Sequence, residues 1–155
     1  MSELAPAGAV ELRRLGDGEI SAARALLAAC ELPVDDLANP AISLIGAFHG
    51  HDLVGVIGLE ACESVGLLRS LAVAGGHRGR GVARDLCDHL FALATERGIE
   101  TLFLLTTTAA DYFARLGFVA IDRDAAPGSI QTTTQFASIC PTSARVMRRV
   151  CAGSQ

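Results

Sequence analysis

The chain has 155 residues, contains no tryptophan and only one tyrosine, and has charged side chains at 19% of its positions. Its net charge of -4 gives no overall attraction to nucleic acid, and it lacks the extended basic face and aromatic platforms that nucleic-acid binding requires. It also lacks an uninterrupted run of about 18 apolar residues, the minimum for a membrane-spanning helix. We therefore expect neither nucleic acid nor a membrane as a partner. Because the first residues lack the apolar stretch of a signal peptide, we expect a cytoplasmic location.

The cysteines lack the spacing of a metal site. No C-x-x-C pair or nearby histidine pattern is present, so we expect no metal. In a reducing compartment most of them act as small apolar side chains, although a set of soft thiolates that binds trivalent arsenic is an open alternative. The five cysteines are Cys30, Cys62, Cys87, Cys140 and Cys151.

Half of the residues are hydrophobic, which predicts a single domain, residues 1–155, with its core from about residue 10 to 150. Asp17 is the expected cap of the first helix, and the polar segment 33–40 is expected to be a loop or one helical turn outside the core. Apolar periodicity and turn residues predict the other elements. We expect strands at 10–14, 42–48, 53–59, 65–73, 100–106, 118–121 and 143–150, and helices at 17–30, 82–97, 109–116 and from Pro127 toward Ser138.

The segment GGHRGRGVAR, residues 75–84, joins a predicted strand to an amphipathic helix. Unpaired N–H groups at the start of a helix bind anions, and glycine lets the backbone approach a phosphate closely. Arg78, Arg80 or Arg84 can add charge-assisted hydrogen bonds, so a diphosphate fits this turn better than a lone carboxylate. Neither G-x-x-x-x-G-K-[S/T] nor G-x-G-x-x-G is present, which excludes the P-loop and the Rossmann fingerprint.

What the segment does contain is Arg78-x-x-Gly81-x-Ala83, after a strand ending in LAV and before a helix. Together with the later strand and the helix ending in LGF, this order resembles the acetyl-CoA motif of the GNAT family of N-acetyltransferases. The resemblance implies the GNAT fold, an α/β (α+β) architecture. Its central sheet would be mixed and mostly antiparallel, with six to seven strands, helices on both faces, and a splay between the fourth and fifth strands.

The same resemblance implies that acetyl-CoA is the cosubstrate. The main chain of Leu71 and Val73 would hydrogen-bond the pantetheine arm as an added strand does, and the N–H groups of residues 78–83, with Arg84, would hold the pyrophosphate. The residues expected to contact the cosubstrate are Leu71, Ala72, Val73, Arg78, Gly79, Arg80, Gly81, Val82, Ala83, Arg84, Thr106 and Phe113.

The sequence departs from the family at the usual base. Many members carry a glutamate near the start of the strand that leads to the turn, and Leu67 stands at that position here. Glu60 is the nearest alternative carboxylate and Glu63 is the second; either can deprotonate the amine through a water molecule, and Glu60 is the predicted base. The alternative is that both glutamates only solvate a turn.

The usual general acid is also absent. The family tyrosine of the motif Tyr-x-x-x-Gly-Phe corresponds to Phe113. Tyr112 lies about 100° further around the helix and is expected to point elsewhere. The leaving thiolate, with a solution pKa near 8.5, would then take its proton from water or from the departing ammonium.

The apolar run LLRSLAV places an arginine where it needs a partner. A substrate carboxylate would bind Arg69 through two hydrogen bonds, and the alternative is a structural ion pair with Glu60 or Asp111. Threonine hydroxyls at 106–108 can bind substrate or cap the next helix. The predicted substrate-binding residues are Arg69, Ser70, Thr107 and Thr108.

Three segments, LLRSLAV, LLTTTA and TTTQFASICPTSARVM, resemble the GNAT subgroup associated with arsenic-resistance operons. Relatives in that subgroup acetylate amino-acid antibiotics such as arsinothricin and phosphinothricin. The resemblance implies an acceptor that is a small anionic amino acid, a glutamate analogue, and a role in arsenic or antibiotic resistance. Because Leu67 and Phe113 replace the usual base and acid, a non-catalytic acyl-CoA sensor or interaction module stays open. A homodimer is one possible assembly.

Overall fold

The computed structural model describes residues 10–133, 136 and 144–151. They form a seven-stranded sheet in the order β1-β2-β3-β4-β5-β7-β6. The pairs are antiparallel except for β4 and β5, which run parallel, so the sheet is mixed and mostly antiparallel as predicted. The strands are β1 (Glu11–Arg14), β2 (Ile42–His49), β3 (Asp52–Cys62), β4 (Val65–Val73), β5 (Thr101–Thr106), β6 (Val119–Ile121) and β7 (Arg145–Val150).

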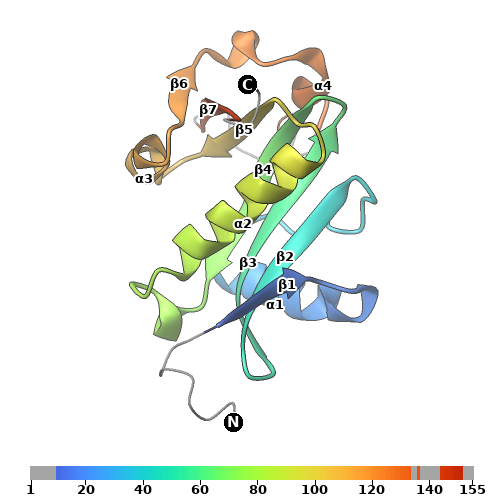
Figure 1. Ribbon diagram of the computed structural model, residues 1–155, viewed down its shortest axis with the longest axis vertical. Coiled ribbons are helices and arrows are strands. Elements are labelled where there is room, and N and C mark those ends of the chain that lie inside the picture. Colours follow the sequence, from blue (N-terminus) through green and yellow to red (C-terminus); the bar gives the residue numbers. More distant parts are fainter. Residues whose placement is uncertain (1–9, 134–135, 137–143, 152–155) are drawn as a thin grey trace.

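Helices cover both faces of the sheet (Figure 1). Successive side chains of β4 point to opposite faces and pack against different helices. Leu67 lies in a buried cluster with Ile130 of α4, whereas Leu68 lies in a second cluster with Leu86 of α2 on the opposite face. Because both faces are covered, the central strands are apolar almost throughout. The helices are α1 (Ile20–Ala29), α2 (Val82–Glu96), α3 (Ala110–Arg115) and α4 (Gly128–Gln131). None of the described helices is long and apolar enough to cross a membrane.

The start of the first helix differs from the prediction. Asp17 begins a short 3-10 helix and does not cap α1. The Gly16 N–H instead donates to the Glu19 carboxylate over 2.9 Å, so the glutamate three residues further on binds the free backbone donor.

The polar segment 33–40 forms turns, as predicted, but it contributes to the core. Leu37 is 3% exposed and packs in the cluster beneath α1, and Val34 packs against the same cluster, because the turns direct both side chains inward. At the other end of the chain, α4 has four residues, and Ser138, the predicted limit of that helix, lies outside the described residues.

The sheet opens between its fourth and fifth strands, as the family resemblance implies. Pairing of β4 with β5 ends at Leu67 and Phe103, and the strands separate beyond these residues. On its other side β4 carries a bulge, since Val56 pairs with Ala72 but Gly58 pairs with Arg69. Ser70, at this irregularity, has a φ of 60°. The bulge and the splay therefore coincide.

Candidate active site

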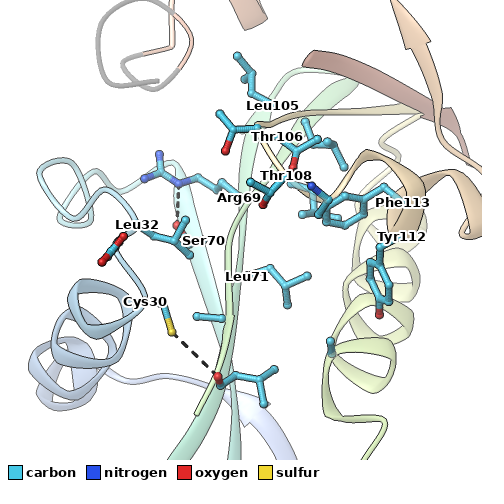
Figure 2. Close-up of a pocket in the computed structure, with 18 of the residues that line it drawn as sticks. Cys30, Leu32, Arg69, Ser70, Leu71, Leu105, Thr106, Thr108, Tyr112 and Phe113 are labelled. Carbon is cyan, nitrogen blue, oxygen red and sulfur yellow. Dashed lines mark hydrogen bonds between the residues drawn. The ribbon is translucent and has the colours of Figure 1, made fainter. Parts of the chain in front are cut away.

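A cavity of about 1010 Å³ occupies the splay. Its walls come from the loop after α1, from β4, from the glycine-rich turn, from the end of β5 and from α3 (Figure 2). We call residues 77–84 the turn end, and residues 31–35 with Arg69, Ser70 and residues 106–108 the loop end. Lining residues of the turn end are His77, Arg78, Gly79, Gly81, Ala83 and Arg84, and those of the loop end are Glu31, Leu32, Pro33, Asp35, Arg69, Ser70, Thr106, Thr107 and Thr108.

The turn end is built by backbone. Gly79 and Gly81 have φ values of 77° and 84°, in the left-handed region that favours glycine, and Gly81 is the N-cap of α2. No atom lies within 4 Å of where a Cβ would stand on either glycine, so the surface is open to a ligand. The first N–H groups of this 15-residue helix have no acceptor within the helix and lie at its positive end. The turn end is therefore suited to an anion.

The arginines of the turn differ in their surroundings. Arg78 donates from Nε to the Val73 carbonyl over 2.9 Å and bends back toward β4. Arg84 is exposed, and its Nε lies 3.2 Å from Asp88. Of the predicted cosubstrate contacts, Arg80 and Val82 do not line the cavity, and the Val82 side chain is buried in the core.

Beyond Leu67, the edge of β4 that faces the splay is not paired with β5. An extended ligand can therefore hydrogen-bond Leu71 in the way an added strand does. The Val73 carbonyl already accepts from Arg78, and the Cys30 thiol lies 4.0 Å from the same oxygen. Residues Arg69 to Val73 of β4 line the cavity, and Figure 2 shows Leu71 within this stretch. Because Arg69 belongs to the loop end and Val73 contacts Arg78 of the turn end, β4 connects the two ends.

Tyr112 and Phe113 both line the cavity, so the expectation that Tyr112 points away from it is wrong. Helix α3 has six residues and closes one side of the splay, which lets neighbouring side chains contact the same space. Their rings meet edge to face at 5.4 Å. In Figure 2 the Tyr112 hydroxyl points away from Thr106 and Thr108. Burial raises the pKa of Tyr112, so its hydroxyl stays protonated at neutral pH.

Arg69 is 3% exposed and is held by two carboxylates. Its Nη1 and Nη2 donate to the two oxygens of Asp36 over 2.6 and 2.5 Å, and Nη1 also donates to Glu60 over 3.0 Å. The Nε donates to the Ser70 hydroxyl over 3.1 Å. The hydrogen bonds from Arg69 hold the pKa of Asp36 below its usual value. The ion pair with Glu60 was one predicted alternative, whereas Asp36 was not foreseen.

This arrangement corrects the prediction that Arg69 binds a substrate carboxylate through two hydrogen bonds, because Asp36 already occupies that side of the guanidinium. The arrangement also argues against Glu60 as the base that deprotonates the amine. The Glu60 side chain is 6% exposed, accepts from Arg69 and does not line the cavity. Glu63 is exposed in the turn between β3 and β4, and Leu67, at the family's usual base position, is fully buried.

Threonines complete the loop end. The Thr106 hydroxyl accepts the N–H of Ala109, the residue before α3, over 2.9 Å, and so fixes the turn that leads into this helix. Thr107 and Thr108 are exposed and line the cavity. Three hydroxyl-bearing residues therefore face the space opposite β4.

The cysteines lie in different places. Cys30 lines the cavity, whereas Cys87 and Cys151 are buried, and burial raises the pKa of Cys87 to about 12. Cys140 lies outside the described residues. Within the part of the chain that the structure describes, no three histidine, cysteine or acidic side chains are grouped to hold a metal ion.

A model of the acetyltransferase (GNAT) family matches residues 13–118, which contain the end of β1, all of β2 to β5 and α1 to α3, and most of the cavity lining. The chain belongs to this family. The GNAT fold implied by the sequence is thereby confirmed.

This GNAT protein is similar to the uncharacterized N-acetyltransferase YsnE of Bacillus subtilis, with 29% identity over 82 residues. The match covers 52% of this chain and 54% of YsnE, so the chain spans about half the length of that relative. Solved structures share its fold. N-acetylglutamate synthase from Neisseria gonorrhoeae, complexed with coenzyme A and N-acetyl-glutamate, superposes with a TM-score of 0.78 and 23% identity over 95% of this chain and 36% of that one. A GNAT acetyltransferase from Staphylococcus aureus superposes with a TM-score of 0.75 and 20% identity, over 92% of this chain and 99% of that one.

The structure gives the cavity-lining Arg69 one partner that the sequence did not indicate. Asp36 lies in a polar loop, 33 residues before its partner Arg69, and no motif marks it. The single available signal was the buried arginine itself, which requires a partner without specifying which of the acidic residues provides it.

Proposed function

We propose that this protein transfers the acetyl group of acetyl-CoA to the amine of a small acceptor. The observation that carries the proposal is one continuous cavity that joins a diphosphate-sized turn to the opening between β4 and β5. The turn end would bind the pyrophosphate through backbone N–H groups, with Arg78 and Arg84 adding positive charge. The unpaired edge of β4 would hold the pantetheine arm, which directs the thioester toward the loop end.

Acetyl transfer forms a bond between the amine nitrogen and the acetyl carbon, and breaks the bond between that carbon and sulfur. The amine must first lose a proton, which needs little help for an α-amino group because its pKa is about 8. A water molecule at the loop end suffices as the base. The thiolate then takes a proton from water or from the positively charged nitrogen that has bonded to the acetyl carbon.

The acceptor we propose is an amino acid, with glutamate analogues such as arsinothricin and phosphinothricin as the first candidates and resistance to arsenic or to such antibiotics as the consequence. The likeness to the arsenic-associated subgroup supports this, as does a synthase of N-acetylglutamate with the same fold. One observation opposes a doubly anionic acceptor. Of the basic residues among the described cavity lining, only Arg69 belongs to the loop end, and Asp36 and Glu60 neutralise it.

A panel of acceptors tests the proposal. Thiol release from acetyl-CoA is measured with glutamate, its arsenic and phosphorus analogues, neutral amino acids and cationic amines. We expect release with at least one α-amino acid, and the rank order of the three charge classes identifies the acceptor class. No release with any acceptor would refute acetyl transfer. Replacement of Gly81 by valine is the matched control, because it blocks the turn end and leaves the loop end intact.

A second function is favoured by specific residues. Leu67 and Phe113 stand where the family usually has its base and acid, and Glu60 does not line the cavity. A non-catalytic acyl-CoA sensor would keep the turn end and lose turnover. Calorimetry that detects CoA binding without thiol release from any acceptor would favour this function over acetyl transfer.

A further inference from the structure

Three charged side chains meet beside the loop end. Asp36 comes from the loop between α1 and β2, Glu60 from β3 and Arg69 from β4. Their side chains are 8%, 6% and 0% exposed, respectively. We call these residues the buried triad. It connects a loop to two neighbouring strands of the sheet.

The buried triad is not explained by stability alone. One guanidinium lies between two carboxylates, and removing ions from water is so costly that apolar residues of similar volume often stabilise a fold equally well. The surroundings are nevertheless fitted to the arginine. A Cβ on Gly58 would lie 3.3 Å from Cγ of Arg69 and 3.1 Å from Leu44, so glycine leaves the space that the arginine stem uses. What the triad adds is a fixed geometry.

That geometry sets one wall of the cavity. Residues 31–33 and 35 line it, and the next two residues attach their loop to the sheet. Asp36 binds the Arg69 guanidinium through both oxygens, and Leu37 inserts into the core. Without the contact at Asp36, the wall would depend on the end of α1 and on the apolar packing of Leu32, Val34 and Leu37 in the core cluster. Arg69 thus fixes the position of the wall relative to β4.

We propose that Asp36 is a positioning residue that, through Arg69, holds the loop wall of the cavity, residues 31–35, against β4. The inference rests on the proposed acetyl transfer, because it takes this wall to be the surface that binds the acceptor. Asp36 itself does not line the cavity, so it acts only through its partner.

The contacts of Arg69 predict an asymmetric effect. When Asp36 is replaced, Arg69 keeps its hydrogen bonds to Glu60 and to the Ser70 hydroxyl. The bulge in β4 therefore stays in place, and with it the backbone that faces the pantetheine arm. Residues 31–35 of the loop wall, all described in the structure, make no hydrogen bond of their own to Arg69. Loss of Asp36 should weaken acceptor binding and leave CoA binding unchanged.

The test is Asp36→Asn in the full chain, with steady-state kinetics for both substrates and calorimetry with CoA. We expect KM for the acceptor to rise about tenfold, because a small displacement of the wall misplaces the amine. The Kd for CoA and KM for acetyl-CoA should change less than twofold. Glu19→Gln is the matched control, since it removes a carboxylate bound to an arginine outside the cavity. It should change none of these values.

A conservative variant separates positioning from folding. Asp36→Glu keeps the charge and lengthens the side chain by one methylene, so it should fold and give an acceptor KM between those of the original protein and Asp36→Asn. If both variants leave the acceptor KM unchanged, or raise the Kd for CoA as much as the acceptor KM, Asp36 does not position the wall.

Amide hydrogen exchange gives a readout that requires no acceptor. In Asp36→Asn, residues 31–37 should exchange faster, whereas residues 65–73 of β4 should keep their protection. Equal exchange in both proteins, or equal loss of protection in the loop and in β4, would overturn the inference. If the original protein acetylates nothing, acetyl transfer fails as a function, and exchange still decides whether Asp36 holds the loop.

Discussion

The two ends of the cavity are built in opposite ways. The turn end is made by backbone from consecutive residues, with Gly79 and Gly81 in left-handed conformations and exposed arginines around them. The loop end depends on side chains from distant elements, among them a buried arginine between two carboxylates. Under the proposed function, the turn end would bind the pyrophosphate mainly through backbone N–H groups, which depend little on side-chain identity. The loop end, built from side chains, would then determine the acceptor.

The largest effect should come from removing the cation of the buried triad. Arg69→Met leaves Asp36 and Glu60 buried without their partner, which should lower the free energy of unfolding by about 3–5 kcal/mol. Arg13→Met is the matched control, because Arg13 binds Glu19 with both nitrogens on the surface, where water replaces the lost partner. Urea denaturation of both variants checks this. Equal losses would show that burial does not distinguish the two arginines.

A smaller effect is expected at the turn end. Gly81→Ala places a Cβ at a φ of 84°, which should cost about 1 kcal/mol of stability. It should also weaken CoA binding about tenfold, equal to 1.4 kcal/mol, because the Cβ stands where a phosphate would approach. Gly76→Ala, in the same turn at an ordinary φ, is the control and should bind CoA normally. Calorimetry measures both. Normal binding by Gly81→Ala would remove the turn end from the CoA site.

Acid should act on the loop end through Asp36. Its pKa is lowered in the folded protein, so its contribution to stability is complete above the usual aspartate pKa of about 3.9. It is lost as the pH falls through the lower, folded-state value. Urea denaturation between pH 6 and pH 2 should therefore show a steeper loss of stability in the original protein than in Asp36→Asn. The contribution of Glu19, whose pKa is lowered to about 2, is common to both and cancels. If stability fell equally steeply with pH in both proteins, the ion pair of Asp36 with Arg69 would not stabilise the fold.

The smallest effect concerns labelling and leaves stability unchanged. The thiolate is the form that reacts with iodoacetamide, and Cys87 is buried with its pKa raised to about 12. Cys30 lines the cavity and should be modified first at pH 8. Mass spectrometry with and without CoA measures the rates. CoA should protect Cys30, because the pantetheine arm would pass beside Val73; equal labelling in its presence would place the arm elsewhere.

Much of the fold followed from local patterns. The bounds of β4 matched the prediction, and α2 ended one residue earlier than expected, because apolar periodicity and bordering glycines act over a few residues. The cap of the first helix was predicted at Asp17, but the backbone used Glu19 instead, since both are acidic and only the geometry of the turn selects between them. The burial of Leu37 was missed because the few apolar residues of this short polar loop do not form a periodic pattern.

The sequence by itself determined the turn end. Glycines at 79 and 81 before an amphipathic helix allow a positive φ and leave free N–H groups, and those are properties of neighbouring residues. Only the tertiary structure decided the loop end. The sequence showed that Arg69 needed a partner. Asp36 is that partner because the loop after α1 lies beside Arg69 at the edge of the splay. The pairing of buried charges is chosen by distance in space, which no local pattern encodes.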